Sequence, residues 1–344
     1  MNDVFEHIPM DKQWLAKNAI KDFGKNKNLK LFCKDPFDGC SIDRFGNVFV
    51  CTCDGKLPVS VGHILDFRSL EDIWNNSTAA SLQQSILDGS FCYCDVNACG
   101  ILHSNNTTAD NYFKQARRKE IFLNIDESCN LQCPSCRDGL IYIKSGQDYN
   151  NKKRWVTYFH ELIKNYSGAL DLYTSGNGDP FASEIYQEFL QTCRLKPNQK
   201  FNFLTNGLLL KQRIADNPYL ITNTDTVMIS IDAGSKAVYE DVRRPGKWVR
   251  LVENLDYLLE LVQKYSINAQ LNFVIQRANY RDIPNFIQLA ENYGFRTHYA
   301  LLEDWRTFGG DFYQKNAVHL PTHPEYNDWL EIYHQYQSQI NLAR

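Results

Sequence analysis

Residues 121–136 have the sequence IFLNIDESCNLQCPSC, and this stretch decides how the rest of the chain is interpreted. It opens with an apolar, β-branched run at 121–125 that predicts a strand, and it continues into Cys129, Cys133 and Cys136. In folds built from repeated strand–helix units, chemistry takes place in the loops that follow the strands. The three cysteines are therefore predicted to lie at a functional site.

The chain beyond this stretch alternates between short apolar runs and amphipathic helical patterns. Five more strand-like runs occur, at 169–174, 201–205, 226–231, 269–275 and 298–302. The helical patterns between them include WVTYFHELIKNY, SEIYQEFLQTC, VRLVENLDYLLELVQKY and DIPNFIQLAENYGF. Such alternation predicts parallel strands joined by right-handed crossovers. Because six units are too few to close an eight-stranded barrel, we expect an α/β fold with a partial (β/α)6 TIM-like barrel.

The composition is that of a globular protein, with 344 residues, 43% of them hydrophobic and 22% charged. The net charge of -3 gives no basic field that would attract nucleic acid. No apolar run approaches the ~18 residues that a membrane-spanning helix needs. The N-terminal sequence MNDVFEHIPMDK lacks the apolar stretch of a secretory signal. We therefore expect a cytosolic protein with no membrane span and no nucleic-acid partner.

Eleven cysteines are unevenly spread along the chain, with seven between Cys33 and Cys99, three in the 129–136 stretch, and Cys193 alone. Disulfides are rare in a reducing compartment, so clustered cysteines favour metal or cluster ligands. Cys193 ends an amphipathic helical pattern and is interpreted as a buried structural thiol.

The three cysteines at 129, 133 and 136 suit an iron–sulfur cluster. A cubane has four irons, so three closely spaced thiolates leave one iron for another ligand. S-adenosylmethionine (SAM) can occupy that iron through its amino and carboxylate groups. The alternative is a zinc or redox site, although zinc sites usually use four ligands. The pattern CNLQCPSC resembles the C-x3-C-x2-C motif of the radical SAM superfamily, with Ser135 where that family usually has an aromatic residue.

The resemblance implies that further SAM-binding residues follow on the later strands. SGNGDP resembles the family's Gly-Gly-Glu-Pro turn, with Asn and Asp replacing the first glycine and the glutamate. The fourth strand ends in Ser-Ile-Asp, and the arginine one helical turn after Tyr239 resembles the residue that pairs with the SAM carboxylate. The implied SAM-binding residues are Asn177, Gly178, Asp179, Pro180, Thr205, Asn206, Ser230, Asp232 and Arg243.

The N-terminal cysteines begin around a predicted hairpin, CSIDRFGNVFVC at 40–51. If Phe45-Gly46 is the centre of the turn, Cys40 faces Cys51 across the ladder. Directly opposed residues have Cβ atoms roughly 4.5–5.5 Å apart, close enough for two ligands of one cluster.

This region resembles the SPASM or twitch auxiliary-cluster domain of many radical SAM enzymes, through GNVFVC, VGHILDFRSLEDIWN and FCYCDVNAC. In that family the domain usually follows the core, whereas here it precedes it. The resemblance implies one auxiliary [4Fe–4S] cluster, with two clusters or a structural zinc domain as alternatives. The implied ligands are Cys33, Cys51 and Cys99 with one of Cys40 or Cys92, while Cys53 and Cys94 are further candidates.

The chain is therefore divided into an N-terminal helical segment (1–32), an auxiliary iron–sulfur domain (33–103), a radical SAM barrel (118–305) and a C-terminal extension (306–344). The resemblance implies that a reduced cluster cleaves SAM to a 5′-deoxyadenosyl radical that takes a hydrogen atom from the substrate. A flavodoxin- or ferredoxin-type reductant is the expected partner. Peptide and sugar- or nucleotide-linked substrates stay open. The alternative function is a non-catalytic iron–sulfur electron carrier or zinc scaffold.

Overall fold

The computed structural model describes residues 32–52, 57, 59–95, 99, 112–174, 177–304, 311–340 and 342. Residues 1–31 of the predicted N-terminal helical segment and the candidate ligand Cys53 lie outside these ranges.

Six parallel strands form the core of the molecule, each hydrogen-bonded to the next along the chain. They are β4 (Lys119–Leu123), β5 (Leu170–Thr174), β6 (Gln199–Thr205), β7 (Thr224–Ser230), β8 (Asn268–Ile275) and β9 (Arg296–Leu301). Their number, order and direction confirm the predicted partial barrel.

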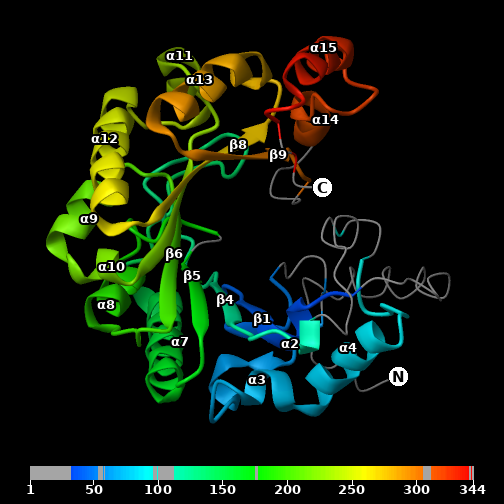
Figure 1. Ribbon diagram of the computed structural model, residues 1–344, viewed down its shortest axis with the longest axis vertical. Coiled ribbons are helices and arrows are strands. Elements are labelled where there is room, and N and C mark those ends of the chain that lie inside the picture. Colours follow the sequence, from blue (N-terminus) through cyan, green and yellow to red (C-terminus); the bar gives the residue numbers. More distant parts are fainter. Residues whose placement is uncertain are drawn as a thin grey trace.

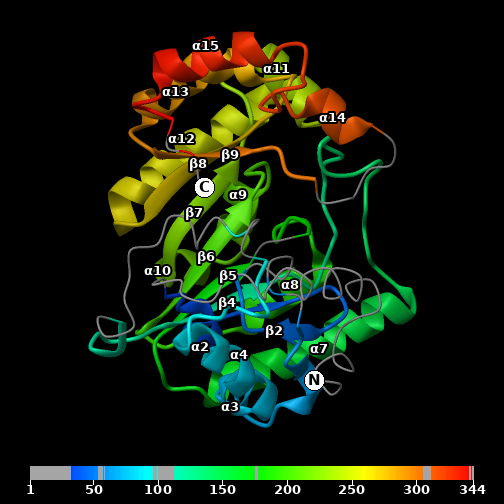
Figure 2. The same cartoon turned by 90° about the vertical axis from the view of Figure 1, so that its right-hand side faces the viewer.

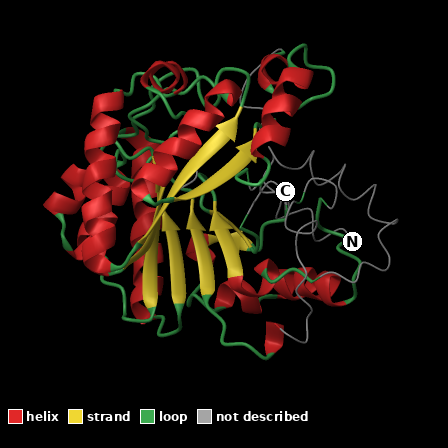
Figure 3. Cartoon of the chain, turned by 45° about the horizontal axis from the view of Figure 1, so that its top comes forward, coloured by secondary structure: helices red, strands yellow, loops and turns green. Residues whose placement is uncertain are grey.

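The helices that connect these strands cover the outer face of the curved sheet (Figures 1 and 3). They are α7 (Gly146–Asn165), α8 (Glu184–Thr192), α9 (Leu210–Asp216), α10 (Tyr219–Thr222), α11 (Lys236–Val242), α12 (Trp248–Tyr265) and, after η4 (Tyr280–Asp282), α13 (Ile283–Tyr293). In α12, the buried Leu251, Leu255 and Leu258 recur at helical spacing, which gives the helix one apolar face for the sheet.

Alternation along the strands distinguishes the two faces of the sheet. In β8, Leu271, Phe273 and Ile275 are fully buried. Phe273 packs against Phe286 of α13, with ring centroids 4.8 Å apart. The residues between them, including Gln270 and Asn272, are half-buried. Since successive side chains point to opposite faces, these half-buried side chains line the concave face of the sheet.

The N-terminal cysteine-rich segment joins the same sheet instead of forming a separate one. Its elements are α2 (Asp35–Asp38), β1 (Gly39–Ile42), β2 (Asn47–Phe49), β3 (Gly62–His63), η3 (Ile64–Asp66), α3 (Asp72–Asn75) and α4 (Ser77–Leu87). Strand β1 pairs in parallel with β4, which gives a nine-stranded sheet of order β3-β2-β1-β4-β5-β6-β7-β8-β9. The segment that carries the auxiliary cysteines therefore extends the barrel at its first strand.

The hairpin register differs from the prediction by one residue. Ser41 pairs with Phe49, so Cys40 and Cys51 are not opposite each other and the predicted facing pair is wrong. The cause is the Asp43 side chain, whose Oδ1 accepts hydrogen bonds from the backbone N–H groups of Phe45 and Asn47. This side-chain cap builds a three-residue loop in place of the predicted two-residue turn.

The stretch SLEDIWNNSTAASLQQSIL forms two helices, α3 and α4. Asn76 ends α3 in an extended conformation, and its side chain accepts a hydrogen bond from the backbone N–H of Ala79 at 3.0 Å. Asparagine competes well as a helix N-cap, so the chain starts a new helix at this position.

Helix α7 of the barrel holds the N-terminal segment in place. Lys152 is 1% exposed, and its Nζ donates to the carbonyls of Ile125 (2.8 Å) and Arg44 (3.1 Å). One and two turns further on, Trp155 contacts the ring of His63 and Tyr158 donates to the carbonyl of Phe67 at 2.7 Å. The segment and the barrel are thus joined by a strand and by a helix.

The C-terminal region lies at the other edge of the sheet, across the molecule from the N-terminal elements (Figure 2). It contains α14 (Phe312–Asn316) and α15 (Tyr326–Tyr336), and Leu342 forms a parallel bridge with Tyr299 of β9. Arg281 and Tyr280 bind Glu325 and Asp328 at the start of α15. Within the described part of the chain, no helix has the length and apolarity needed to span a membrane.

Candidate active site

The three-cysteine loop follows β4 directly, at the carboxyl end of the barrel strands. Tyr186 of α8 fixes the start of this loop, because its hydroxyl accepts from the backbone N–H of Ile125 (2.8 Å) and donates to the carbonyl of Leu123 (2.7 Å). Cys129 is paired with Ile141 in an isolated bridge. The loop is therefore held at both ends before any cofactor binds.

The thiols of Cys129 and Cys133 are buried, whereas Cys136 is exposed. Burial raises the pKa of the Cys129 thiol to about 12, with Asp179 adding to the effect. Burial also raises the pKa of Cys133, although the neighbouring Arg243 lowers it. Since metals bind the thiolate, cluster binding must release these protons, and nearby cations favour that step.

The three thiols form one neighbourhood. The side chain of Arg137 is desolvated, yet its pKa is raised by Cys136, Cys129 and Cys133 together. Among the residues that the structure describes, no group of three His, Cys, Asp or Glu could hold a single metal ion. A four-iron cluster offers a separate iron to each thiolate, so three thiols in one loop fit that group and leave one iron open.

Two of the predicted turns meet at Asp179. This carboxylate is 2% exposed, and burial raises its pKa while the hydrogen bonds that it accepts lower it. Its Oδ2 accepts from Thr205 Oγ1 (2.8 Å) and the N–H of Asn206 (2.7 Å), and its Oδ1 accepts from the N–H groups of Phe181 and Ala182. Asp179 therefore connects the turn after β5 to the turn after β6 through these hydrogen bonds.

The turn after β5 also packs on the cysteine loop. A Cβ atom at Gly178 would lie 2.5 Å from the carbonyl oxygen of Ser128, and the N–H of Asp179 donates to that same oxygen at 2.8 Å. Pro180 is buried beside it. Asn177 is exposed, and its carbonyl accepts from Arg137 Nη2. Only glycine at 178 allows this close backbone approach.

The turn after β6 reaches the first cysteine. Asn206 Nδ2 donates to Asn130 Oδ1 at 2.7 Å and lies 3.8 Å from Cys129 Sγ. Thr205 is buried and its hydroxyl also accepts from the N–H of Gly207, which has a φ of 80°.

The turn after β7 reaches the second cysteine. Arg243, at the end of α11, places Nη2 2.7 Å from Asp232 Oδ2 and Nη1 3.7 Å from Cys133 Sγ. Asp232 Oδ1 accepts from the N–H of Val274 at 2.8 Å. Ser230 ends the strand, is half-buried, and is aligned with Asn272 of β8.

Some residues beside this site carried no prediction. Gln276 follows β8, is 4% exposed, and its Nε2 lies 3.5 Å from Ser135 Oγ. Arg137 donates to the carbonyl of Glu127 at 2.7 Å. A polar residue directly after a buried strand was the available signal for Gln276, because it repeats the position of the other strand-end residues.

The N-terminal cysteines fall into different surroundings. Burial and Asp35 raise the pKa of Cys33, with Cys94 and Cys99 contributing, and burial, Cys99 and Cys92 raise that of Cys94. These four thiols therefore lie together. Cys40 is fully buried on β1, where burial raises its pKa and the neighbouring Lys119 lowers it.

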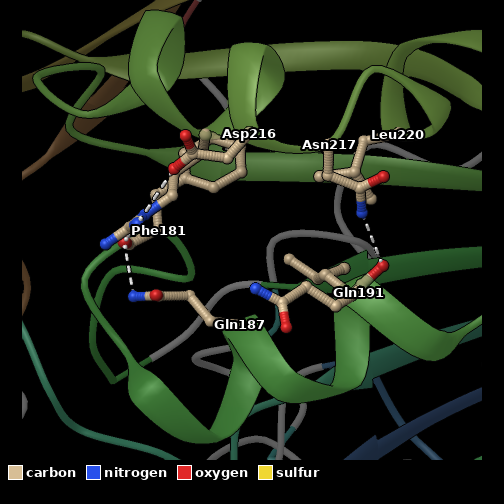
Figure 4. Close-up of a pocket in the computed structure, with 8 residues that line it drawn as sticks. Phe181, Gln187, Gln191, Asp216, Asn217 and Leu220 are labelled. Carbon is tan, nitrogen blue, oxygen red and sulfur yellow. Dashed lines mark hydrogen bonds and ion pairs between the residues drawn. The ribbon is translucent and has the colours of Figure 1, made fainter.

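A small pocket lies on the outer side of the molecule, among α8, α9 and α10 (Figure 4). Its polar groups are used internally: Asn217 donates to the carbonyl of Leu190 at 3.0 Å, and Gln187 and Arg213 donate to that of Phe181. It lies away from the cysteine loop.

Comparison with known families gives two matches. The model described as the radical SAM superfamily matches residues 123–290. The model described as an iron–sulfur cluster-binding domain, SPASM, matches residues 33–100. The auxiliary domain thus precedes the core, as predicted.

Individual relatives are distant. A "Probable GTP 3′,8-cyclase" from Saccharolobus islandicus is 22% identical over 179 residues, 51% of this chain and 54% of that protein. A "PqqA peptide cyclase" from Granulibacter bethesdensis is 23% identical, over 48% of this chain and 42% of that protein. The chain spans about half the length of the curated relatives it matches.

Solved structures were compared in the same way. Native anSMEcpe with bound AdoMet has a TM-score of 0.38 and 18% identity, over 54% of this chain and 51% of that chain. Streptococcus suis SuiB bound to S-adenosylmethionine has a TM-score of 0.40 and 13% identity, over 91% of this chain and 71% of that chain.

Proposed function

We propose that this protein cleaves SAM reductively and abstracts a hydrogen atom from a substrate, because residues 123–290 match the radical SAM superfamily and residues 33–100 match the SPASM domain. Domains of these two families bind [4Fe–4S] clusters and SAM. Members of the superfamily are enzymes, and the matched relatives include cyclases.

One observation carries the proposal: residues from two later strand ends converge on the cysteine loop. Arg243 Nη1 is 3.7 Å from Cys133 Sγ, and Asn206 Nδ2 is 3.8 Å from Cys129 Sγ. An electron carrier needs thiolate ligands, but it has no use for an arginine fork and an amide beside them. This convergence supports a site for a small polar cofactor next to the cluster.

The protein residues have separate tasks in this proposal. Cys129, Cys133 and Cys136 hold the cluster. When bound, the cluster supplies the electron that cleaves SAM to methionine and a 5′-deoxyadenosyl radical. Further residues surround SAM on the same side of the sheet: Asn177, Gly178, Asp179, Pro180, Thr205, Asn206, Ser230, Asp232 and Arg243.

Asp179 is proposed to act as a positioning residue and not as a direct ligand of SAM. Since both of its oxygens are occupied by protein donors, it holds two turns in register instead of offering a free carboxylate to the SAM ammonium. The polar atoms left for that ammonium are backbone carbonyls of the turn that Asp179 fixes.

The auxiliary cluster is proposed to bind Cys33, Cys94 and Cys99, with Cys92 or Cys51 as the fourth thiolate. Cys94 and Cys99 raise the pKa of Cys33, and Cys99 and Cys92 raise the pKa of Cys94, which supports this set. The N-terminal segment is built onto β4 and α7, so this cluster would keep a constant position relative to the barrel. It would accept an electron from the substrate radical or position the substrate.

The substrate is proposed to bind on the concave face of the sheet. There, Phe122 and Tyr173 are half-buried and stack with ring centroids 4.3 Å apart and planes at 1°. Asn272 and His298 are aligned on the neighbouring strands β8 and β9. The two candidate classes are a ribosomally made peptide and a sugar- or nucleotide-linked molecule, and the names of the matched relatives include one of each kind.

The test is anaerobic reconstitution followed by addition of SAM and dithionite. We expect 5′-deoxyadenosine, and we expect its loss in a Cys133→Ala variant. A wild-type protein that carries its full iron content but forms none would favour the electron carrier or scaffold instead. Replacing dithionite with a flavodoxin or ferredoxin tests the proposed class of reductant. A true substrate raises 5′-deoxyadenosine formation above the substrate-free rate.

A further inference from the structure

Helix α11 ends with two buried hydrogen-bond donors that have no partner in the part of the chain that the structure describes. They are the hydroxyl of Tyr239 and Nε of Arg243. Tyr239 is fully buried, and the Arg243 side chain is 12% exposed. The two residues are four apart and the N–H of Arg243 donates to the carbonyl of Tyr239 at 2.8 Å, so their side chains leave one helical turn together.

The Tyr239 hydroxyl belongs to the neighbourhood of the cysteine loop. Burial is the largest cause of its raised pKa, Arg243 lowers it, and Cys133, Asp232 and Asp179 raise it further. The hydroxyl therefore keeps its proton at neutral pH and can donate to an acceptor. The same turn contacts the loop through its backbone, since the N–H of Gln132 donates to the carbonyl of Arg244 at 2.7 Å.

The space next to this hydroxyl is kept open by a glycine. A Cβ atom at Gly246 would lie 3.0 Å from Tyr239 Oη and 2.6 Å from the carbonyl oxygen of Arg243. On its other side the Tyr239 ring packs edge-on against Trp248, at 5.6 Å between centroids. The ring is thus fixed by apolar packing while its polar end has neither a partner nor a crowding side chain.

A buried donor without an acceptor costs about 1–3 kcal/mol, so two of them in one turn indicate an acceptor that arrives with a ligand. Both Nη atoms of Arg243 are engaged, one by Asp232 and one by Cys133. Nε is the nitrogen of that fork that has no hydrogen-bond partner among the described residues. A donor from guanidinium and a donor from a phenol hydroxyl, side by side, suit the two oxygens of a carboxylate.

We propose that Tyr239 is a SAM-binding residue whose hydroxyl, together with Arg243 Nε, donates to the SAM carboxylate. This inference rests on the proposed function and adds a residue to it. Asp232 has a supporting part, because its ion pair with Nη2 holds the arginine side chain in place.

The test compares Tyr239→Phe with Tyr299→Phe in reconstituted full-length protein. Phenylalanine removes one oxygen atom and keeps the ring. Tyr299 is the matched control, because its hydroxyl is also buried but its ring packs against Phe273 and Phe286 on the outer face. Three quantities are measured: iron content, the midpoint potential of the SAM-free cluster, and the Kd for radiolabelled SAM by equilibrium dialysis.

For Tyr239→Phe we expect the Kd to rise roughly 10- to 100-fold, the loss of one hydrogen bond to a charged group, with iron content and potential unchanged. Tyr299→Phe should match the wild type in all three. An unchanged Kd in Tyr239→Phe would overturn the proposal. A shifted midpoint potential with an unchanged Kd would also overturn it, since the acceptor would then be the cluster. A Tyr239→Phe protein that no longer loads iron would overturn it as well. If the wild type itself binds no SAM, the proposed function fails first.

Discussion

Arg243 and Asp232 form a buried ion pair in which Nη2 lies 2.7 Å from Oδ2, while Nη1 of the same arginine lies 3.7 Å from Cys133 Sγ. Asp232 adopts a φ of 56°, a left-handed conformation that non-glycine residues seldom take and that aspartate and asparagine tolerate best. The turn after β7 therefore places the carboxylate of Asp232 where it neutralises the buried guanidinium of Arg243.

Asp232→Ala is expected to lower the free energy of unfolding by about 3–5 kcal/mol, because it leaves a buried guanidinium without its counter-charge. Asp241→Ala is the matched control: its partner Arg244 is next to Arg243 in sequence, but both side chains are more than half exposed, so about 1 kcal/mol or less is expected. Urea unfolding monitored by circular dichroism measures both. Equal effects would contradict the buried pair.

Lys152→Met tests the connection between the barrel and the N-terminal segment. The change removes the hydrogen bonds that Lys152 donates to the carbonyls of Ile125 and Arg44, and we expect a loss of roughly 2–4 kcal/mol in unfolding free energy. The neighbouring Lys153 is 45% exposed and pairs with Glu188, so Lys153→Met should leave the unfolding free energy nearly unchanged.

Hydrogen exchange locates the effect of Lys152→Met. Faster exchange in both the Asp43–Asn47 hairpin loop and the strand end at Ile125 is expected, because Lys152 links them. Faster exchange confined to α7 would argue that the lysine stabilises its own helix only.

Gly178→Ala tests the contact between the turn after β5 and the cysteine loop. The new Cβ would lie 2.5 Å from the carbonyl oxygen of Ser128, so the turn must move, at a cost of about 1–3 kcal/mol. We expect reduced SAM-dependent 5′-deoxyadenosine formation. Gly139→Ala is the control in the same loop region, since nothing lies within 4 Å of its added Cβ. Similar activity in both variants would show that this approach is not needed.

The strands of the barrel were predictable because each is a short apolar run followed by a helical repeat, and this local pattern is the same in β5, β7 and β8. The pairing of β1 with β4 was not. It joins Cys40 to a partner at Ile121, about eighty residues later, and no local signal reports which edge of a sheet a hairpin will extend. The hydrogen bonds of the Asp43 side chain were likewise not predicted. They shift the register of the hairpin from the one that the turn residues alone indicate.

The sequence predicted where the site residues lie in the fold, but it did not predict which residues they contact. The pattern placed Asp179 and Asp232 at strand ends. In the structure, Asp179 accepts hydrogen bonds from protein donors, and Asp232 accepts from a backbone N–H and pairs with Arg243. Sequence reports which residues reach one end of the sheet. It does not report how they bond to one another once there, and Tyr239 and Gln276 acquired their positions only through packing.

Cys94→Ala and Cys40→Ala separate two descriptions of the auxiliary site. Cys94 lies with Cys33, Cys92 and Cys99, whereas Cys40 lies on β1 near Lys119. Removing Cys94 is expected to lower the iron content from about eight to about four per chain, the loss of one cubane. Cys40→Ala should retain about eight. Iron and sulfide analysis after anaerobic reconstitution measures this, and loss of iron from Cys40→Ala alone would reverse the assignment.

Acid should release the C-terminal region from the barrel. Burial acts to raise the pKa of Glu325, but hydrogen bonds from Arg277, Tyr280 and Arg281 outweigh it and lower the pKa to about 2. A carboxylate with a folded pKa below its unfolded value of roughly 4.3 contributes stability that is full above that value and is lost as the pH falls toward 2.

We therefore expect the attachment of α15 to weaken between about pH 4.5 and pH 2, seen as rising protease sensitivity or hydrogen exchange in residues 311–340. Glu325→Gln removes the titrating group while keeping the shape of the side chain. Its α15 should be looser at neutral pH and lose less on acidification than the wild-type helix does. A Glu325→Gln protein whose pH profile for this segment matches that of the wild type would mean that another group, such as Asp328, controls the attachment, because the ion pairs of Glu325 with Arg277 and Arg281 would then carry no pH-dependent free energy.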